Sequence, residues 1–315
     1  MTINGVHLTT FLAAMLAAGL LRAVPLATAA LGEAVAERAG LLNLGIEGMM
    51  LSGCFFGFWA AYRTDSLFYG MAGAMAAGLV LGLIFGVLAI TCRVDQVLVG
   101  LAITIFGAGL TGFLFRDIFA GQNTAADVNP HQISIPWLRD IPVIGKPLFN
   151  EQLLFYVAWL LAPLFSFLLM RTRFGLNVRA VGENPFAADA GGVDVVRVRY
   201  VAIAIAGVMA GFAGGFLCVS DVKIFTINMT VGQGFIALAI AMLGQWRPWR
   251  IMAGAILFGM LVSLGDGLQI LGVNLGHVEF IGMAPYIGVM LALVFLAGRT
   301  ALPAALGIPY ARGSR

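Results

Sequence analysis

The residues that could do chemistry are a few polar side chains inside long apolar runs of the sequence. Glu47 lies in LLNLGIEGMML, four residues after Asn43, so the two would share a helix face if a helix continues through Gly45. Polar groups are costly to bury in a membrane, which makes each of them a candidate for function. The same reasoning selects four more residues, which are Gln96, Thr104, Gln233 and Asp266.

These six side chains have two possible roles. They could line the path of a polar solute through the membrane, which is the role that we predict for them. They could instead form hydrogen bonds between helices, or a salt bridge from Arg22 to Glu47 or to Asp266. A proton relay needs several acids on adjacent helices, and of the six only Glu47 and Asp266 are acids, so an ion-driven carrier has little support.

Covalent chemistry has no support in the sequence. The two lysines, Lys146 and Lys223, are followed by Pro and Ile, which excludes a phosphate-binding loop of the GxxxxGK[ST] type. His7, His131 and His277 lie far apart and form no HExxH or similar array. We therefore predict no catalytic residue, no metal site and no cofactor in this chain, and a protein that is not an enzyme.

The elements that position these side chains must be membrane helices. Of the 315 residues, 61% are hydrophobic and 10% are charged, whereas a soluble domain carries about 25% charged residues. A helix needs about 20 apolar residues to cross a bilayer. Nine runs qualify, at about 8–30, 41–61, 67–91, 96–116, 152–170, 200–220, 229–245, 250–272 and 279–298. We predict an all-α, polytopic transmembrane helix bundle of about nine spans, within a range of about 8–10.

The seventh run and the glycines add detail to this bundle. The apolar centre of 229–245 is barely long enough to cross, so this run could be a broken or re-entrant element. Glycines recur at every fourth position at 78, 82 and 86, and again at 207, 211 and 215, which predicts tight helix packing. Phe55, Phe56 and Phe58 point around their helix, and we expect them mainly to face lipid.

The distribution of positive charge predicts the orientation. With nine spans, one face receives twelve Lys and Arg residues and the other receives five. The positive-inside rule makes the richer face cytoplasmic, which places the N-terminus outside and the C-terminus in the cytoplasm. The loop of about 117–151, rich in proline, is then external, and the loop of about 171–199 is cytoplasmic.

A short helix with both ends marked is predicted in the cytoplasmic loop, within GENPFAADAGG. Asn184 can cap it, Pro185 suits its first position, and two glycines end it after Ala190. A helix with defined ends can dock in a groove of a soluble motor and move as a rigid body; a generic loop would explain the flanking arginines but not the two caps. The residues assigned to this docking element are Gly182, Glu183, Asn184, Pro185, Phe186, Ala187, Ala188 and Gly191.

Three segments carry a resemblance to a known family. They are RTRFGLNVRAVGENPFAADAGGVDVVRVRYVAIAIAGVMAGFAGG, ERAGLLNLGIEGMMLSG and GQGFIALAIAMLGQWRPW. The first contains a G-x-N-P-x-A-A pattern, formed by Gly182, Asn184, Pro185, Ala187 and Ala188. It resembles the cytoplasmic loop of bacterial ABC-importer permeases of the branched-chain amino acid, ribose and nucleoside group. The other two resemble motifs of the nucleoside and simple-sugar branch, and the resemblance runs from about Glu33 to Gly298.

The resemblance implies a single transmembrane permease domain over residues 1–315, with GENPFAADAGG as the coupling helix. The chain resembles the smaller of two different permease subunits, which implies a heterodimer enclosing a path for nucleosides. It implies an ABC ATPase that binds ATP and Mg, an extracytoplasmic substrate-binding protein, and a place in the bacterial cytoplasmic (inner) membrane. No nucleic-acid partner is expected.

Other functions stay open at this point. The same machinery could import a simple sugar or another small neutral solute such as riboflavin. An ion-coupled secondary transporter would need no ATPase. A membrane enzyme or an assembly scaffold has no residue that argues for it.

Overall fold

The computed structural model describes residues 2–3, 6–120, 125–126, 128, 131–139, 141, 143–270, 287–288 and 302–311. In these residues six helices are long and apolar enough to cross a membrane. They are Thr10–Arg38, Leu67–Thr91, Gln96–Phe119, Leu153–Arg171, Val195–Val222 and Pro248–Gly265. The predicted helical membrane bundle is thus confirmed, while the count of nine spans and the orientation stay predictions.

The long helices are α1 (Leu8–Arg38), α2 (Ile46–Thr64), α3 (Leu67–Gly86), α4 (Gln96–Phe119), α7 (Leu153–Arg171), α10 (Val195–Gly215) and α12 (Pro248–Ile270). Helices α3 and α10 continue as π-helical turns over Val87–Thr91 and Phe216–Val222. The short helices are α5 (Pro136–Arg139), α6 (Gly145–Phe149), α8 (Arg173–Glu183), α9 (Pro185–Ala190) and α11 (Gln233–Leu243). Two antiparallel strand pairs, β1 (Thr2–Ile3) with β2 (Val6–His7) and β3 (Gln132–Ser134) with β4 (Asn150–Gln152), add a minor β component.

Side-chain caps fix where several helices begin. The Asp95 carboxylate accepts the N–H groups of Val97 and Leu98 at the start of α4. Asp194 does the same for α10, where it accepts from the Arg197 N–H at 3.0 Å. Such caps satisfy N–H groups that have no partner inside the helix, so these starts are encoded locally.

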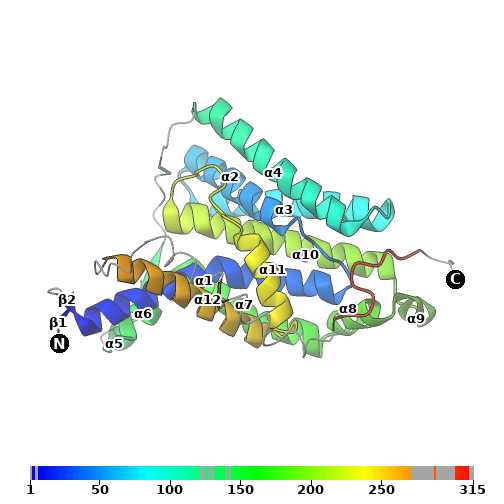
Figure 1. Cartoon of the computed structure of the whole chain (residues 1–315). Helices are drawn as coiled ribbons and strands as arrows, with labels where there is room; N and C mark the ends of the chain where they lie inside the picture. The colour runs from blue at the N-terminus through cyan, green and yellow to red at the C-terminus, as the bar shows by residue number, and fades with distance from the viewer. Residues whose placement is uncertain are drawn as a thin grey trace.

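Helices α1 and α10 form the middle of the bundle. Helix α1 packs against α10, α11 and α12, and α10 packs against α2 and α3. In Figure 1 α1, α10 and α12 run lengthwise through the bundle, α4 lies obliquely along its upper edge, and α11 crosses the centre at a steep angle. Helices α8 and α9 lie at one end, together with residues 302–311, and β1, β2, α5 and α6 lie at the other.

The predicted glycine stripes pack against each other. A Cβ added at Gly78 would lie 2.1 Å from the Gly207 carbonyl oxygen, and one at Gly211 would lie 2.3 Å from the carbonyl oxygen of Ala74. Backbone therefore touches backbone along the contact of α3 with α10, as expected for small residues in membrane helices. The prediction of tight packing from the four-residue spacing is confirmed.

Two of the three phenylalanines of α2 do not face lipid, so the expectation was wrong for Phe55 and Phe58, while Phe56 is partly exposed. Phe55 and Phe58 are fully buried in the protein. The Phe225 ring lies 5.3 Å from the Phe55 ring, and the Phe119 ring lies 5.3 Å from the Phe58 ring. These rings join α2 to α4 and to the segment after α10, where edge-to-face contacts favour aromatic clustering.

Four of the predicted spans, the first, second, sixth and seventh, differ clearly in extent from the helices observed. The first continues to Arg38, and the second begins as a helix only at Ile46. The sixth covers Val195–Val222. The seventh contains α11, whose 11 residues reach only about 16 Å along the axis, half of the hydrocarbon thickness. The ninth, 279–298, lies outside the described residues except for Ile287 and Gly288.

Helices begin or end inside both of the predicted loops. Helices α8 and α9 fill most of 171–199, and α10 already begins at Val195. In 117–151, α4 continues to Phe119, and the described part further on holds β3, α5, α6 and the start of β4.

Candidate functional site

The Glu47 carboxylate anchors the start of α11. Glu47 lies in the first turn of α2 and is only 8% exposed. Its Oε1 accepts hydrogen bonds from the Thr230 hydroxyl at 2.6 Å and the Gly232 N–H at 2.8 Å, and its Oε2 accepts from the Gly234 N–H at 2.6 Å. The first N–H groups of a helix lack partners and carry partial positive charge, so a carboxylate is well matched to this place.

Two glycines make this contact possible. Gly232 has φ +80°, a left-handed conformation that other residues rarely adopt. A Cβ added at Gly234 would lie 2.7 Å from the Glu47 Cα and the same distance from its Oε2. The backbone of α11 thus lies in close contact with α2, and the GQG sequence at the start of the helix allows this contact.

Asn43 belongs to a turn and not to the helix that carries Glu47. Its Nδ2 donates to Glu33 Oε2 at 3.1 Å, and its Oδ1 accepts from the Gly45 N–H at 3.0 Å. Because α2 begins only at Ile46, the condition under which Asn43 and Glu47 would share a helix face is not met. The salt bridge considered from Arg22 to Glu47 is replaced by the three neutral donors of Thr230, Gly232 and Gly234.

Gln96 and Thr104 of α4 support the same turn. The Gln96 Oε1 accepts from the Leu42 N–H at 2.7 Å, and the Thr104 hydroxyl donates to the Leu44 carbonyl oxygen at 3.0 Å. Each side chain pairs backbone groups that the break between α1 and α2 leaves free, and an unpaired backbone group inside a membrane is costly. In the described part of the chain, the Gln96 Nε2 and the Gln233 Oε1 are buried and have no partner.

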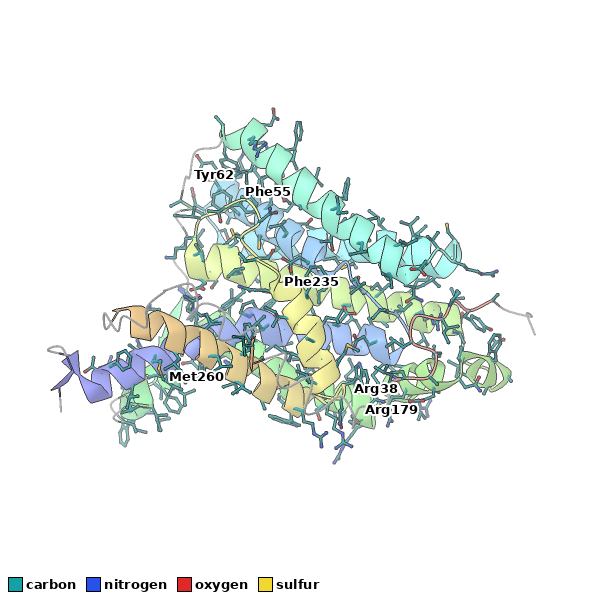
Figure 2. All side chains as sticks on the ribbon, in the orientation of Figure 1. Arg38, Phe55, Tyr62, Arg179, Phe235 and Met260 are labelled. Carbon is teal, nitrogen blue, oxygen red and sulfur yellow. The ribbon has the colours of Figure 1, made fainter. Side chains whose placement is uncertain are left out.

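The structure therefore gathers five of the six candidate residues around two helix starts. Asn43, Gln96 and Thr104 hold the turn before α2, and Glu47 holds the start of α11, where Gln233 is the first residue. Asp266 lies on α12, and its side chain is outside the described part of the structure. Figure 2 shows Phe235, the third residue of α11, where α11 crosses the middle of the view.

A cavity of about 470 Å³ lies away from this cluster. Its lining includes Ser66 and Phe68 near the start of α3, and Leu153 at the start of α7. None of the six candidate residues lines it. The polar cluster is thus a positioning device for α2 and α11 in this conformation and not the wall of that cavity.

Two buried acids of α1 were missed by the sequence analysis. Glu33 and Glu37 are fully buried, on successive turns beyond the predicted end of the first span. Glu37 accepts a hydrogen bond from the Trp246 Nε1, and the Arg38 guanidinium lies 5.4 Å from the centre of the Trp246 ring. The signal that could have found them is the four-residue spacing of Glu33 and Glu37 in an apolar run that continues to Arg38.

The short helix α9 has the boundaries that the sequence predicted, Pro185–Ala190. The Asn184 Oδ1 accepts from the Ala187 N–H at 3.0 Å, and the Gly191 N–H donates to the Ala187 carbonyl oxygen at 3.0 Å. Gly192 has φ +85° and completes the stop. Both ends are thus closed by local contacts.

The two faces of α9 differ in exposure. Phe186 is 48% exposed, and Glu183, Asn184, Ala187 and Gly191 are exposed as well. Gly182, Pro185 and Ala188 are buried against the rest of the chain. A partner can therefore reach Phe186 and Ala187, whereas Ala188 points into the protein and cannot fill a partner's groove, contrary to the expectation for it.

The Arg38 end of α1 lies against α8. A Cβ added at Gly182 would lie 2.0 Å from the Arg38 carbonyl oxygen, so only glycine allows the contact. Figure 2 shows Arg38 of α1 and Arg179 of α8 side by side at this end of the bundle. Helix α8, which leads into α9, thus packs directly against the end of α1.

The helical bundle resembles a solved ABC transporter in its fold. The structure matches a solved one described as "An inward-facing conformation of a putative metal-chelate type ABC transporter", with a TM-score of 0.50 and 17% identity. The match covers 90% of this chain and 85% of the other, and at this identity it shows the fold alone.

The chain belongs to the family of permease components of branched-chain amino acid transport systems, which matches residues 15–271. It is 37% identical over 310 residues to the guanosine ABC transporter permease protein NupQ of Bacillus subtilis (strain 168), covering 95% of this chain and 96% of NupQ. It is also 37% identical to the putative glucose ABC transporter permease protein TsgC13 of Haloferax volcanii, over 90% of this chain and 85% of that one. The nucleoside ABC transporter permease protein NupC of Lactococcus lactis subsp. cremoris is 32% identical, over 92% and 94%.

Membership in this family establishes the class of function. The chain is the membrane-spanning permease component of an ABC transport system, a transport subunit and not an enzyme. The resemblance seen in its three sequence motifs is confirmed.

Proposed function

We propose that this chain forms half of the translocation path of an ABC importer for nucleosides. Two relatives with nearly full-length matches are a guanosine and a nucleoside permease, at 37% and 32% identity. A nucleoside is neutral and polar, which suits a path whose carboxylate, Glu47, is already engaged by three donors of the protein itself.

The geometry of α9 is the main support for the coupling part of this proposal. It is closed at both ends, exposes Phe186, and sits through Gly182 on the end of α1. In this proposal α9 is the coupling helix, its end of the bundle faces the cytoplasm, and an ABC ATPase binds there. The ATPase binds ATP and Mg, and this chain contributes no cofactor.

The partners follow from the same proposal. A second chain of Bacillus subtilis, the guanosine ABC transporter permease protein NupP, is 26% identical over 75% of this chain, besides NupQ. Two different permeases from one organism favour a heterodimer here, with this chain as the smaller subunit. A substrate-binding protein delivers the solute on the face of the β3–β4 loop, and the complex lies in the bacterial cytoplasmic membrane with nine spans and the N-terminus outside.

In this proposal the polar cluster controls the path by holding α11. Half-helices in transporters often end at the membrane midplane, where irregular backbone borders a cavity. Next to the anchored end of α11, Val231 is 68% exposed and Phe235 is 39% exposed, so both are available to a passing solute. Asn43, Gln96, Thr104 and Gln233 act on the path through the turns that they fix, and Asp266 completes the proposed set from α12.

The test is reconstitution of the complete transporter in proteoliposomes. We expect ATP-dependent uptake of labelled guanosine or another nucleoside when the ATPase, the second permease and the binding protein are all present. Without the ATPase, we expect only background uptake. Uptake by the two permeases alone, driven by a proton or sodium gradient, would contradict the proposal.

A simple sugar is the second candidate substrate, because the putative glucose permease TsgC13 is also 37% identical. Competition by unlabelled glucose against nucleoside uptake distinguishes the two. Under our proposal, unlabelled nucleosides abolish the signal and glucose leaves it unchanged; the reverse result would assign the transporter to sugars, and riboflavin serves as a third competitor.

The coupling assignment has its own prediction. The variant Asn184→Ala loses the cap of α9, which costs a helix about 1 kcal/mol, and we expect uptake to fall several-fold. The variant Asn184→Asp keeps an oxygen acceptor and should transport nearly as the native protein does. Normal uptake by Asn184→Ala, at equal insertion in the membrane, would contradict the role of α9.

A further inference from the structure

Residues 302–311, here called the strap, return to the α8–α9 end of the bundle and bind its backbone. The Ala305 N–H donates to the Gly182 carbonyl oxygen at 2.9 Å, and the Gly307 N–H donates to the Gly40 carbonyl oxygen at 3.1 Å. Ala305 itself is buried. The strap therefore joins the end of α8 to the residues that follow α1 (Figure 1).

Arg199 of α10 ties the strap to the same place. Its side chain is 1% exposed, its Nε donates to the Ala39 carbonyl oxygen at 3.2 Å, and its Nη1 donates to the Ile308 carbonyl oxygen at 3.1 Å. A cation at the carbonyl end of α1 interacts favourably with the helix dipole. A buried guanidinium is costly unless it is bonded, so the strap supplies an acceptor that Arg199 needs.

Tyr310 connects the strap to α9 itself. Tyr310 is 7% exposed, and its ring centre lies 5.3 Å from that of Phe186 at an angle of 57°. Such a separation and tilt give a favourable aromatic contact. One face of the Phe186 ring is thus held by the protein, while the residue remains 48% exposed to a partner.

We propose that the strap is a brace that fixes α9 to α1 and α10, so that a push on α9 moves these helices as one body. This inference rests on the proposed function, in which an ATPase pushes on α9. Without the brace, α9 would be joined to α10 by a small packing contact, which includes the buried Ala188, and by the turn Gly191–Asp194, whose two glycines bend easily. Motion of α9 would then be absorbed in that turn, and Tyr310 and Arg199 are the positioning residues that prevent it.

The brace predicts a loss of coupling and not a loss of ATP hydrolysis. In the purified, reconstituted transporter, Tyr310→Ala should lower the amount of solute imported per ATP hydrolysed by about fivefold, the change expected for one aromatic contact. The ATPase should remain bound and active. Tyr310→Phe keeps the ring and should restore the native ratio.

The matched control is Leu302→Ala, at an exposed position at the start of the strap, which should leave the ratio unchanged. If Tyr310→Ala does not assemble, Tyr310→Leu, which keeps apolar bulk without a ring, is measured in the same way and should also lower the ratio. An unchanged ratio in the assembled variant would overturn the brace. Absence of ATP-dependent uptake by the native transporter would instead overturn the proposed function, so the two failures are distinguishable.

Discussion

At the scale of single residues, Glu47 illustrates how neutral donors can stabilise a carboxylate in a membrane protein. Its two carboxylate oxygens accept hydrogen bonds from two backbone N–H groups and one hydroxyl, all within 2.8 Å. Hydrogen bonds to a charged group contribute about 1.5–3 kcal/mol each, which offsets part of the cost of burial. The Glu47 carboxylate therefore serves to hold the start of α11 in place.

We predict that Glu47→Gln destabilises the start of α11 by about 3 kcal/mol, because an amide offers one acceptor where the carboxylate offers two. Thermal unfolding of the purified protein and uptake per inserted molecule measure the effect, and both should fall. The control Thr230→Ser keeps the hydroxyl donor and should behave as the native protein does. Native stability of Glu47→Gln would show that the anchor is unimportant.

The sequence identified the important polar residues but not what they bind. Periodicity and hydropathy select Glu47, Gln96 and Thr104 because they stand out from their apolar neighbours. Their partners are backbone groups from segments distant in the sequence, such as Leu42 for Gln96, and no local signal reports such contacts. Arg199 was missed for a related reason, because an arginine at the edge of a span resembles a solvated loop residue until the strap covers it.

At the scale of elements, α9 and α11 mark the two limits of prediction from sequence. The ends of α9 are set by Asn184, Pro185 and Gly191, so local rules gave its bounds without error. The break before α2 depends instead on Glu33 and on α4, so the apolar run from residue 41 did not show where the helix begins. Helix ends that rest on local caps are predictable, and those that rest on tertiary partners are not.

The glycine contact between α3 and α10 gives a prediction for packing. In Gly78→Ala, the new Cβ would meet the Gly207 carbonyl oxygen at 2.1 Å, so the helices must separate, at a cost of about 2 kcal/mol. The melting temperature in detergent should fall by several degrees. Gly112→Ala is the control, because its Cβ would meet only Ile227, at an ordinary 3.7 Å. Equal melting temperatures for the two variants would refute the close contact.

Glu151, which lies on β4 of the β3–β4 strand pair, gives a prediction for the pH dependence of local stability. Burial, with a smaller effect from nearby Asp221, raises the pKa of Glu151 from 4.5 to about 7. A raised pKa means that the folded hairpin favours the protonated acid, so this stabilisation is complete below about pH 4.5 and is lost as the pH rises through about 7. Protease cleavage within residues 131–152 should therefore be faster at about pH 8 than at about pH 6, after correction for the protease's own pH profile. In Glu151→Gln the change should disappear; a change that persists in this variant would have another cause.

At the scale of the whole molecule, the two ends of the bundle carry different structural elements. One end gathers α8, α9 and the strap, and the other carries β1, β2, α5 and α6 (Figure 1). Between them α1 and α10 run as continuous helices, while α2 and α11 begin inside the bundle. This division suits a transport subunit that meets a motor on one face and a delivery protein on the other.

The native cysteines allow a test of this orientation. Cys92 is exposed, and Cys54 and Cys218 are buried. Cys92 follows Thr91, whose hydroxyl lies 2.5 Å from that of Tyr200 near the start of α10, so it belongs to the α9 end. We predict that a membrane-impermeant maleimide labels Cys92 in lysed membranes but not in intact cells.

The control for this labelling is Trp137→Cys in a chain that carries Cys92→Ser. Trp137 is 94% exposed on α5, at the opposite end of the bundle, and a cysteine there should react in intact cells. Labelling of Cys92 from outside would reverse the orientation and with it the place of α9.

The length of α1 has a consequence for the surrounding lipid. Its 31 residues extend about 46 Å, against about 30 Å of hydrocarbon, so even a tilt of about 40° leaves a vertical reach of about 35 Å. Some of α1 must stand clear of the acyl chains at one or both surfaces. Because the Arg38 end of α1 lies against α8, an overhang at that end holds α8 and α9 clear of the acyl chains.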